Sequence, residues 1–563
     1  MLSTIIFIPL LALVVMLLLP DSSKQLFKWV ATGTTFIQLV LALTVYLTYQ
    51  PSDAVGLFYT KDFAFVERIQ WISVMMKNWG GISAHYFVGV DGLSVSMLLL
   101  CGIVMFIGAI ASWNIQKKTK GYFVLYMLLS TAVFGCFVSL DLLLFYLFFE
   151  LMLLPLYFLI GIWGGKRKEY AAIKFFLYTL FGSIFILLVI VGLYLSVIDP
   201  ALTAINLGLV NQLSAVTPEI ITTVQNLLAN NQIPSSAIVH TFDMVLMTDS
   251  NNYIQDGLLS PFINQEIFGY STRSIAFICL FIGFAIKLPV VPFHTWLPDA
   301  HVQAPTAVSV VFAGILLKIG GYGLIRVAYT IFPQEGAHWA WIVALLGVIS
   351  ILWGAYNALA QKDLKRLIAY SSVSHMGFVL LGIASYTVEG MTGAVYQMFS
   401  HGILSALLFI IVGVIYDRVA DRNIDSFKGL ATQMPYYTAV TTIAFFASLG
   451  LPAFSTFIAE VLVFIGAFSS GLIPHWMVLI ALLSIVLTAG YFLWTLQRVF
   501  FGKLWLKDDS WKKSLKDITL RERIMMIPLV TLSFVFGILP MLLISKIAPS
   551  VNLFVEFVNN AIK

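Results

Sequence analysis

The stretch GFAIKLPVVPFHTWLPDAH, Gly283 to His301, decides how this chain folds. It lies between two long apolar runs, yet it contains Lys287, His294 and the prolines Pro289 and Pro292. Proline removes a helix hydrogen bond and leaves backbone carbonyls without partners. A lysine beside such a break predicts a membrane helix that is interrupted at a functional site.

The composition predicts the class of protein around this break. Of the 563 residues, 60% are apolar and only 10% are charged. Inside a membrane the backbone N–H and C=O groups of such a chain must bond each other. The chain therefore forms spanning helices, each of about 20 apolar residues. We therefore predict a single all-α membrane domain over 1–563, with about fourteen spans. They are 2–20, 28–48, 93–113, 119–138, 140–163, 168–197, 273–297, 303–330, 339–358, 362–385, 390–416, 433–468, 474–502 and 522–546.

The loop charges predict how these spans are oriented. Lys and Arg collect in the loops after spans 1, 3, 5, 9, 11 and 13 and are absent from the short loops after spans 4, 8, 10 and 12. Because cytoplasmic loops hold the excess of Lys and Arg, this alternation predicts that both termini lie on the outer side. The long connection 198–273 should lie there too. The net charge of +5 then reflects loop bias and membrane lipid, not nucleic acid.

The motifs of soluble redox and nucleotide sites are missing from this sequence. Its three cysteines, Cys101, Cys136 and Cys279, are scattered through spans and have no metal-ligand spacing. It has neither a Gly-rich dinucleotide fingerprint nor a P-loop. We predict no metal and no bound cofactor on this chain, so any redox chemistry occurs elsewhere.

Ionisable residues inside the apolar segments are the candidate functional groups. Each costs at least about 2.5 kcal/mol at the centre of a bilayer, so each needs a reason. They are Glu150, Lys174, Lys287, His294, Lys318, His375, His401 and Glu460.

Several of these residues also have a purely structural interpretation. Lys174 could extend its amine to the cytoplasmic surface. His294 could bond the backbone freed by the prolines, and His375 and His401 could be satisfied core histidines. Asp141, near a helix start, is interpreted as a group that favours the helix dipole.

A second break predicts an internal repeat. The stretch SLGLPAFSTFIAE, Ser448 to Glu460, places Gly450 and Pro452 in the middle of span 12. Matched interrupted helices in two halves of a chain indicate a transporter with internal repeats. We predict two inverted five-helix repeats, 119–330 with the long outer loop 198–273, and 339–502, with helices 7 and 12 broken.

Several motifs together resemble a known family. They are FVGVDGLS at 87–94, the Glu150 helix, AGILLKIGGYG at 313–323, DLKRLIAYSSVSHMGF at 363–378 and LPAFSTFIAE at 451–460. The chain resembles the antiporter-like, proton-pumping membrane subunits of bacterial NADH-quinone oxidoreductase, respiratory complex I, and among them the chain M type. The motif at 363–378 is also shared with chains L and N and with multisubunit cation/proton antiporters. The connection 198–273 departs from the family, which usually has a shorter link there.

The resemblance implies a translocase subunit in the bacterial inner membrane. Glu150 and Lys287 would form an ion pair, Lys318 and the histidines would carry protons across the middle, and Glu460 would lead to the outer side. NADH, FMN, iron–sulfur clusters and quinone would be bound by other subunits, with chains L and N as neighbours. The alternatives are a subunit of a cation/proton antiporter or membrane-bound hydrogenase arm, and a membrane scaffold without transport.

Overall fold

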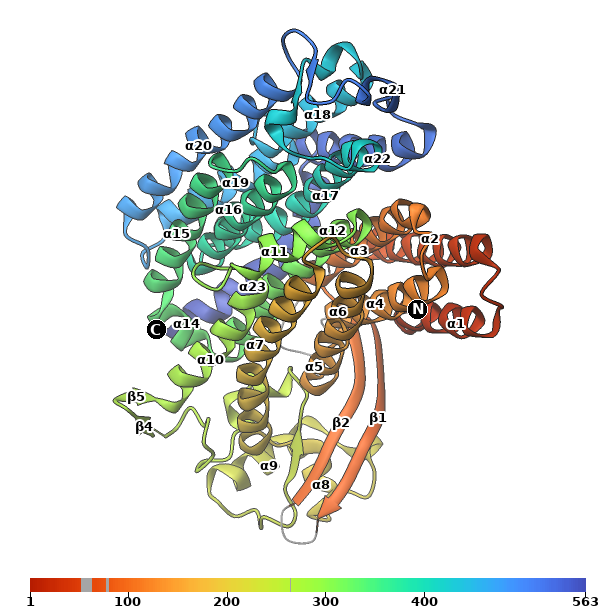
Figure 1. The fold of residues 1–563 in the computed structure, drawn as a ribbon. Helices are drawn as coiled ribbons and strands as arrows, with labels where there is room; N and C mark the ends of the chain where they lie inside the picture. Colours follow the sequence, from red (N-terminus) through yellow and green to blue (C-terminus); the bar gives the residue numbers. More distant parts are fainter. Residues whose placement is uncertain (52–62, 77–79, 264, 563) are drawn as a thin grey trace.

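The protein is a helical bundle with a long β-hairpin at one end (Figure 1). The computed structural model describes residues 1–51, 63–76, 80–263 and 265–562. Within them, eleven helices are long and apolar enough to cross a membrane. They are α2 (Lys24–Thr48), α3 (Gly92–Ala111), α4 (Thr119–Val138), α5 and α6 (Leu142–Leu151 and Leu153–Trp163), α7 (Lys168–Ser196), α12 to η7 (Thr306–Tyr329), α15 (Ala340–Leu359), α16 (Leu364–Ala384), α17 (Val388–Val419), α20 (His475–Val499) and α23 (Met541–Ile562).

The remaining predicted spans are shorter or divided helices. The first is α1 (Leu2–Leu18), and the seventh is divided into α10 (Thr272–Lys287) and α11 (Trp296–Gln303). The twelfth is divided into α18 (Pro435–Ser448) and α19 (Ser455–Ser469). Both predicted helix breaks are therefore present. The count of fourteen spans and the inverted repeat remain predictions.

The predicted last span, 522–546, has the wrong boundary. Helix α22 (Leu520–Ile538) ends before Pro540, and α23 begins at Met541, because proline cannot continue the hydrogen bonding of a helix. Helix α23 buries one face, made of Leu543, Ile547, Val551, Phe554 and Val558. That spacing of three and four residues is typical of an amphipathic helix packed along a surface.

The hydrogen bonds of α23 show which surface it covers. The Tyr46 hydroxyl donates to the Leu542 carbonyl, and the Gly92 amide donates to the Ser550 hydroxyl. At the other end, the Gln334 side chain of α14 (Pro333–His338) donates to the Ala561 carbonyl. Helix α23 therefore lies across the ends of α2 and α3 and against α14.

A β-hairpin lies between the second and third spans, where the sequence predicts no element. Strands β1 (Ala64–Met76) and β2 (Gly80–Val90) are antiparallel, and β3 (Val239–Thr241) pairs parallel to β2. The pairing with β3 joins segments about 160 residues apart, so no local pattern could reveal it. We call the end of the bundle that carries β1, β2 and β3 the hairpin face (Figure 1).

The long connection 198–273 is folded and belongs to the hairpin face. It contains α8 (Pro200–Asn206), α9 (Pro218–Ala229) and the short hairpin of β4 (Glu266–Ile267) and β5 (Tyr270–Ser271). The N-terminal amine also lies there, bonded to Glu67 of β1 at 2.7 Å. Because successive helices reverse direction, the Lys-rich loops lie at the opposite end, which we call the lysine face. That end also carries β6 (Phe427–Lys428), β7 (Trp505–Leu506) and α21 (Trp511–Ser514).

Candidate functional site

Glu150 and Lys287 form no ion pair among the described residues. Glu150 is the second-last residue of α5, which ends at Leu151 because Pro155 removes a backbone donor and crowds the preceding turn. The two charges interact electrostatically, yet within the described residues neither Glu150 Oε1 nor Lys287 Nζ has a hydrogen-bond partner. The predicted pair is therefore adjacent but open in this structure.

The lysine is held against an aromatic ring instead. Lys287 is the last residue of α10 and is 1% exposed. Its Nζ lies 4.2 Å from the centre of the Phe149 ring, the residue before Glu150. A cation over an aromatic face gains about 2 kcal/mol when it is desolvated. This contact stabilises an ammonium group that has no hydrogen-bond partner among the described residues.

The backbone at this break is satisfied by protein groups. The Trp296 indole donates to the Ile286 carbonyl at 2.9 Å, and the Val291 amide donates to the Ser350 hydroxyl at 3.0 Å. Both bonds satisfy backbone groups that lose their helical partners where α10 ends. The break after Lys287 is thus packed and hydrogen-bonded.

Lys318 occupies the centre of the bundle between two π-helical segments, η6 (Phe312–Leu316) and η7 (Leu324–Tyr329), on α13 (Leu317–Gly323). Its Nζ lies 2.7 Å from His401 Nδ1 of α17 and donates to the Ala313 carbonyl. Among the described residues no carboxylate forms an ion pair with it. A π-helical turn frees carbonyls from regular pairing and is common at functional sites. Here one such carbonyl holds the lysine.

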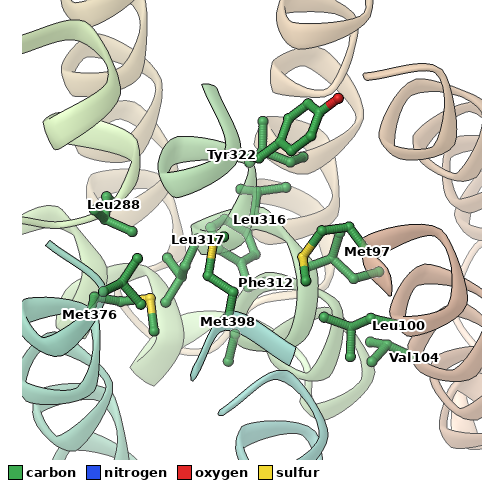
Figure 2. Packing of buried hydrophobic residues seen from close by; sticks show 14 of the residues in the cluster. Met97, Leu100, Val104, Leu288, Phe312, Leu316, Leu317, Tyr322, Met376 and Met398 are labelled. Atoms are coloured by element: carbon green, nitrogen blue, oxygen red, sulfur yellow. The ribbon is translucent and has the colours of Figure 1, made fainter. Parts of the chain in front are cut away.

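Small residues and apolar side chains enclose Lys318. A Cβ on Gly320 would lie 2.6 Å from the Leu288 amide nitrogen, and one on Gly321 would lie 2.6 Å from Met398 Sδ. Only glycine therefore lets α13 approach the break after Lys287 this closely. Figure 2 shows Leu288, Phe312, Leu316, Leu317, Met376 and Met398 packed around this region.

A row of polar groups continues from Lys318 to Glu460. The rings of His401 and His375 lie 5.3 Å apart between centres, and His375 Nδ1 lies 3.7 Å from Glu460 Oε1. A cavity of about 10 Å³, near the minimum for one water molecule, is lined by both histidines. Hydroxyl groups complete its wall: Ser371, Ser405, Ser448 and Thr456. The structure therefore brings four of the predicted residues into one continuous row.

The two remaining predicted residues lie toward the lysine face. Lys174 pairs with Asp299 at 2.7 Å, and Asp299 also contacts Arg366 at 3.2 Å. This arrangement favours the structural interpretation of Lys174. His294 is 5% exposed, and its Nε2 accepts a hydrogen bond from the Trp353 indole at 3.2 Å. The ring also interacts with the Pro292 backbone, a contact that the structural interpretation of His294 predicts.

Two buried groups were not predicted as site residues. His301 is 1% exposed, and within the described residues neither of its ring nitrogens has a hydrogen-bond partner. Lys365, in the first turn of α16, is 4% exposed and donates to the Ala304 carbonyl at 2.6 Å. The sequence signal for His301 was a histidine directly before an apolar span. In the sequence Lys365 cannot be distinguished from the charges of the preceding loop, because the apolar run begins just after it.

The start of α5 is held by a buried charged cluster on the hairpin face. Asp141 accepts bonds from the His85 and Leu144 amides, and Asp243 of the long connection pairs with Arg68 at 3.0 Å. Burial raises the pKa of Asp243 to about 6, although Arg68 opposes the shift. Burial also lowers the pKa of His85 to about 4, so this ring is neutral near pH 7. Asp141 therefore caps the helix, as its structural interpretation predicts.

Comparison with known proteins places this geometry in a family. The model of the family described as "NADH:quinone oxidoreductase/Mrp antiporter, TM" matches residues 139–488. "NADH-quinone oxidoreductase subunit M" of Rhodobacter capsulatus is 36% identical over 555 residues, which cover 98% of this chain and 95% of the relative. "NAD(P)H-quinone oxidoreductase chain 4-3" of Nostoc is 37% identical over 89% of this chain and 78% of its own length.

Solved structures show the same fold. A chain of respiratory complex I from Thermus thermophilus has a TM-score of 0.75 and 25% identity, covering 99% of this chain and 100% of that one. A chain of the Mrp complex from Dietzia superposes with a TM-score of 0.73 at 19% identity, covering 100% and 99%. The second likeness concerns the fold alone. The protein described here belongs to the antiporter-like membrane subunits of NADH-quinone oxidoreductase, in the group of subunit M.

Proposed function

We propose that this chain moves protons across the membrane as part of an NADH-quinone oxidoreductase. Quinone reduction in other subunits, which bind NADH, FMN, iron–sulfur clusters and quinone, would supply the energy. Chains of the L and N type would be its neighbours in the membrane arm. The identity of 36% to subunit M over almost the whole chain favours this function over a cation/proton antiporter or a hydrogenase arm.

The pathway would begin at Glu150 and Lys287 and cross the middle of the bundle. When Glu150 withdraws, Lys287 loses its counter-charge, and burial then favours the neutral amine. Its proton passes toward Lys318, and from there through His401 and His375 to Glu460. Imidazole suits the middle steps because it gains and loses a proton near neutral pH.

One observation carries this proposal: Lys318 is fully buried, and its partners are a histidine ring and a carbonyl, not an acid. A fixed positive charge in such a place would need a permanent counter-ion. A lysine that exchanges its proton does not. The hydrogen bond to His401 then marks the next carrier.

The test exchanges Lys318 in the intact complex reconstituted into liposomes. Arginine keeps the charge but does not deprotonate, so Lys318→Arg should pump poorly, as should Lys318→Ala. Lys318→His should retain measurable proton translocation. Assembly is checked on native gels. Near-normal pumping by the arginine variant would leave Lys318 only a static electrostatic role.

We also propose that the lysine face is cytoplasmic and that both termini lie outside the bacterial inner membrane. The Lys and Arg distribution supports this orientation. A cysteine introduced at Ser235, in a background without accessible cysteines, should react with a membrane-impermeant thiol reagent in intact spheroplasts. Labelling only after lysis would show that the chain has the opposite orientation in the membrane.

A further inference from the structure

Helix α7 packs against both helices of the open Glu150–Lys287 pair, α5 and α10. Gly182 of α7 and Gly283 of α10 lie where these two helices cross. A Cβ on Gly283 would lie 2.7 Å from the Gly182 carbonyl oxygen, so glycine is needed for this close approach. Gly283 is about one helical turn before Lys287. The crossing therefore fixes the position of Lys287 relative to α7.

Ser183 follows directly after the glycine of that crossing. Its side chain is almost fully buried, and its hydroxyl donates to the Leu180 carbonyl at 2.9 Å. The same hydroxyl interacts with two side chains of α5, the Glu150 carboxylate and the Tyr146 phenol. Successive residues of a helix point about 100° apart. Helix α7 therefore contacts α10 through Gly182 and α5 through Ser183.

The Ser183 hydroxyl has one hydrogen and a choice of two acceptors. A serine hydroxyl that bonds a carbonyl of its own helix can rotate toward another acceptor. A hydrogen bond to an ionised carboxylate is roughly twice as strong as one between neutral groups. An ionised Glu150 that moves away from Lys287 therefore competes well with the Leu180 carbonyl for this hydrogen.

We propose that the Ser183 hydroxyl is the second partner of Glu150 and holds its carboxylate while the pair with Lys287 is open. This inference rests on the proposed proton pathway and adds a positioning residue to it. In the closed state the carboxylate pairs with Lys287, and the hydroxyl bonds Leu180. In the open state the hydroxyl turns to the carboxylate, and the Lys287 amine can pass its proton toward Lys318. Because the crossing fixes Ser183 and Lys287 relative to each other, a movement of α5 alone decides between the two states.

The test replaces Ser183 in the intact complex reconstituted into liposomes. Ser183→Ala should make the open state about tenfold less populated, because a hydrogen bond to a charged group is lost. Opening accompanies the loss of the Lys287 proton and is therefore favoured by rising pH. The pH at which pumping reaches half of its maximum on the acidic side should then rise by about one unit. We call this pH the midpoint.

Two conservative variants test whether the hydroxyl itself is needed. Ser183→Thr keeps a hydroxyl and should keep the wild-type midpoint. Ser183→Cys has a thiol, which is a weaker donor, and should raise the midpoint by a smaller amount than Ser183→Ala. Native gels check the assembly of each variant, and the cysteine variant still tests the role of Ser183 if the alanine variant does not assemble.

The matched control is Thr179, about one turn before Ser183 on α7. It is buried, and its hydroxyl donates to the Phe175 carbonyl at 2.8 Å. Thr179→Val removes this hydroxyl at nearly constant volume and should leave the midpoint unchanged. A midpoint that rises equally in Thr179→Val and Ser183→Ala would overturn the role of Ser183, because the loss of any buried hydroxyl of α7 would then have the same effect.

The other titratable groups near the pair are the same in all these variants. Among the described residues, those that interact with Glu150 or Lys287 are Tyr146 of α5 and Cys136 of α4. A difference in the midpoint between the Ser183 variants therefore reports on the hydroxyl.

The same assay separates this inference from the central relay. An unshifted midpoint in Ser183→Ala, at full or reduced pumping, would overturn the role of Ser183 even where the Lys318 variants fail as expected. A raised midpoint in Ser183→Ala together with near-normal pumping by Lys318→Arg would support the role of Ser183 and overturn the relay.

Discussion

The two broken helices differ in the groups that lie at the break. At the break after Lys287 the backbone is satisfied by Trp296 and Ser350, and the ammonium lies against an aromatic ring. At the break before α19, Glu460 packs beside Gly450, where a Cβ would lie 2.8 Å from its Oε2. Hydroxyl groups of Ser400, Ser455 and Thr456 surround that second break.

In the proposed pathway the two halves have different roles. The half with Glu460 contains a row of polar groups at short distances, so it would conduct protons, and we call it the conductor. Within the described residues Lys287 Nζ has no hydrogen-bond partner and forms no ion pair with the nearby Glu150. In the proposed pathway, opening and closing that pair would change the free energy of a buried charge by several kcal/mol. The half with Lys287 would therefore control the transfer, and we call it the switch.

The strongest challenge to this comparison removes the acid of the switch. Glu150→Ala should abolish or strongly reduce proton pumping and the coupled quinone reductase activity, while the complex still assembles. The buried Lys287 would lose the group that stabilises its charged form. Glu150→Asp should retain part of the activity. Coupled NADH oxidation and proton uptake in membrane vesicles measure both variants, and full activity of the alanine variant would remove Glu150 from the mechanism.

A smaller loss is expected when the conductor is interrupted. His401→Gln keeps hydrogen-bonding groups beside Lys318 but cannot carry a proton, so pumping should fall by up to about a hundredfold. A water molecule in the small cavity lined by His375 and His401 would limit the loss. His475→Gln, at the start of α20 outside the row, is the matched control and should pump normally. Proton translocation in liposomes distinguishes them, and equal rates would show that the row does not conduct.

The sequence predicts the switch and the conductor better than it predicts their surroundings. Lys287, Lys318 and Glu460 can be recognised in the sequence because a charged side chain in an apolar span carries a large free-energy cost. Their contacts depend on which helices pack together, as with His401 of α17 beside Lys318 of α13. His301 and Lys365 lie at the ends of apolar runs, where a charge looks ordinary.

The same limit applies to the hairpin face. Strand β3 comes from the long connection and joins a hairpin about 160 residues earlier in the chain. Pairing at that distance depends on the closed fold, not on local pattern. The helix breaks were predictable because proline acts within one turn of its own position.

The smallest expected effect concerns the loop that holds the start of the switch helix. The Leu142 amide donates to the Phe242 carbonyl at 2.8 Å, so the segment with Asp243 is bonded to the first turn of α5. Arg68 of β1 and the N-cap residues of α5 and α8, Asp141 and Asp199, lie near the Asp243 carboxyl. The His85 amide of β2 donates to Asp141.

Burial raises the pKa of Asp243 from 3.8 to about 6, so the folded loop prefers the protonated carboxyl. The loop should be most stable below the ordinary pKa, lose stability as the pH rises toward about 6, and change little above that. Asp199, whose pKa is also raised by burial, adds a trend of the same sign. His85, whose pKa burial lowers from 6.5 to about 4, adds a trend of the opposite sign between these two values wherever the opening of the loop exposes its ring. Asp141, whose pKa burial raises to about 7, adds a trend of the same sign as Asp243 and offsets His85. Asp243→Asn should therefore reduce the pH dependence without removing all of it.

Hydrogen exchange of residues 242–253, corrected for the intrinsic pH dependence of the rate, measures this difference between about pH 5 and about pH 7. The wild-type loop should exchange faster at the higher pH, and Asp243→Asn should show a clearly smaller change. Asp256→Asn, an exposed acid of the same connection, should behave like the wild type. An unchanged slope in Asp243→Asn would mean that the loop is held by its backbone bonds alone. The switch helix would then be anchored independently of the pH on the hairpin face, and only Glu150 and Lys287 would respond to protons in that half.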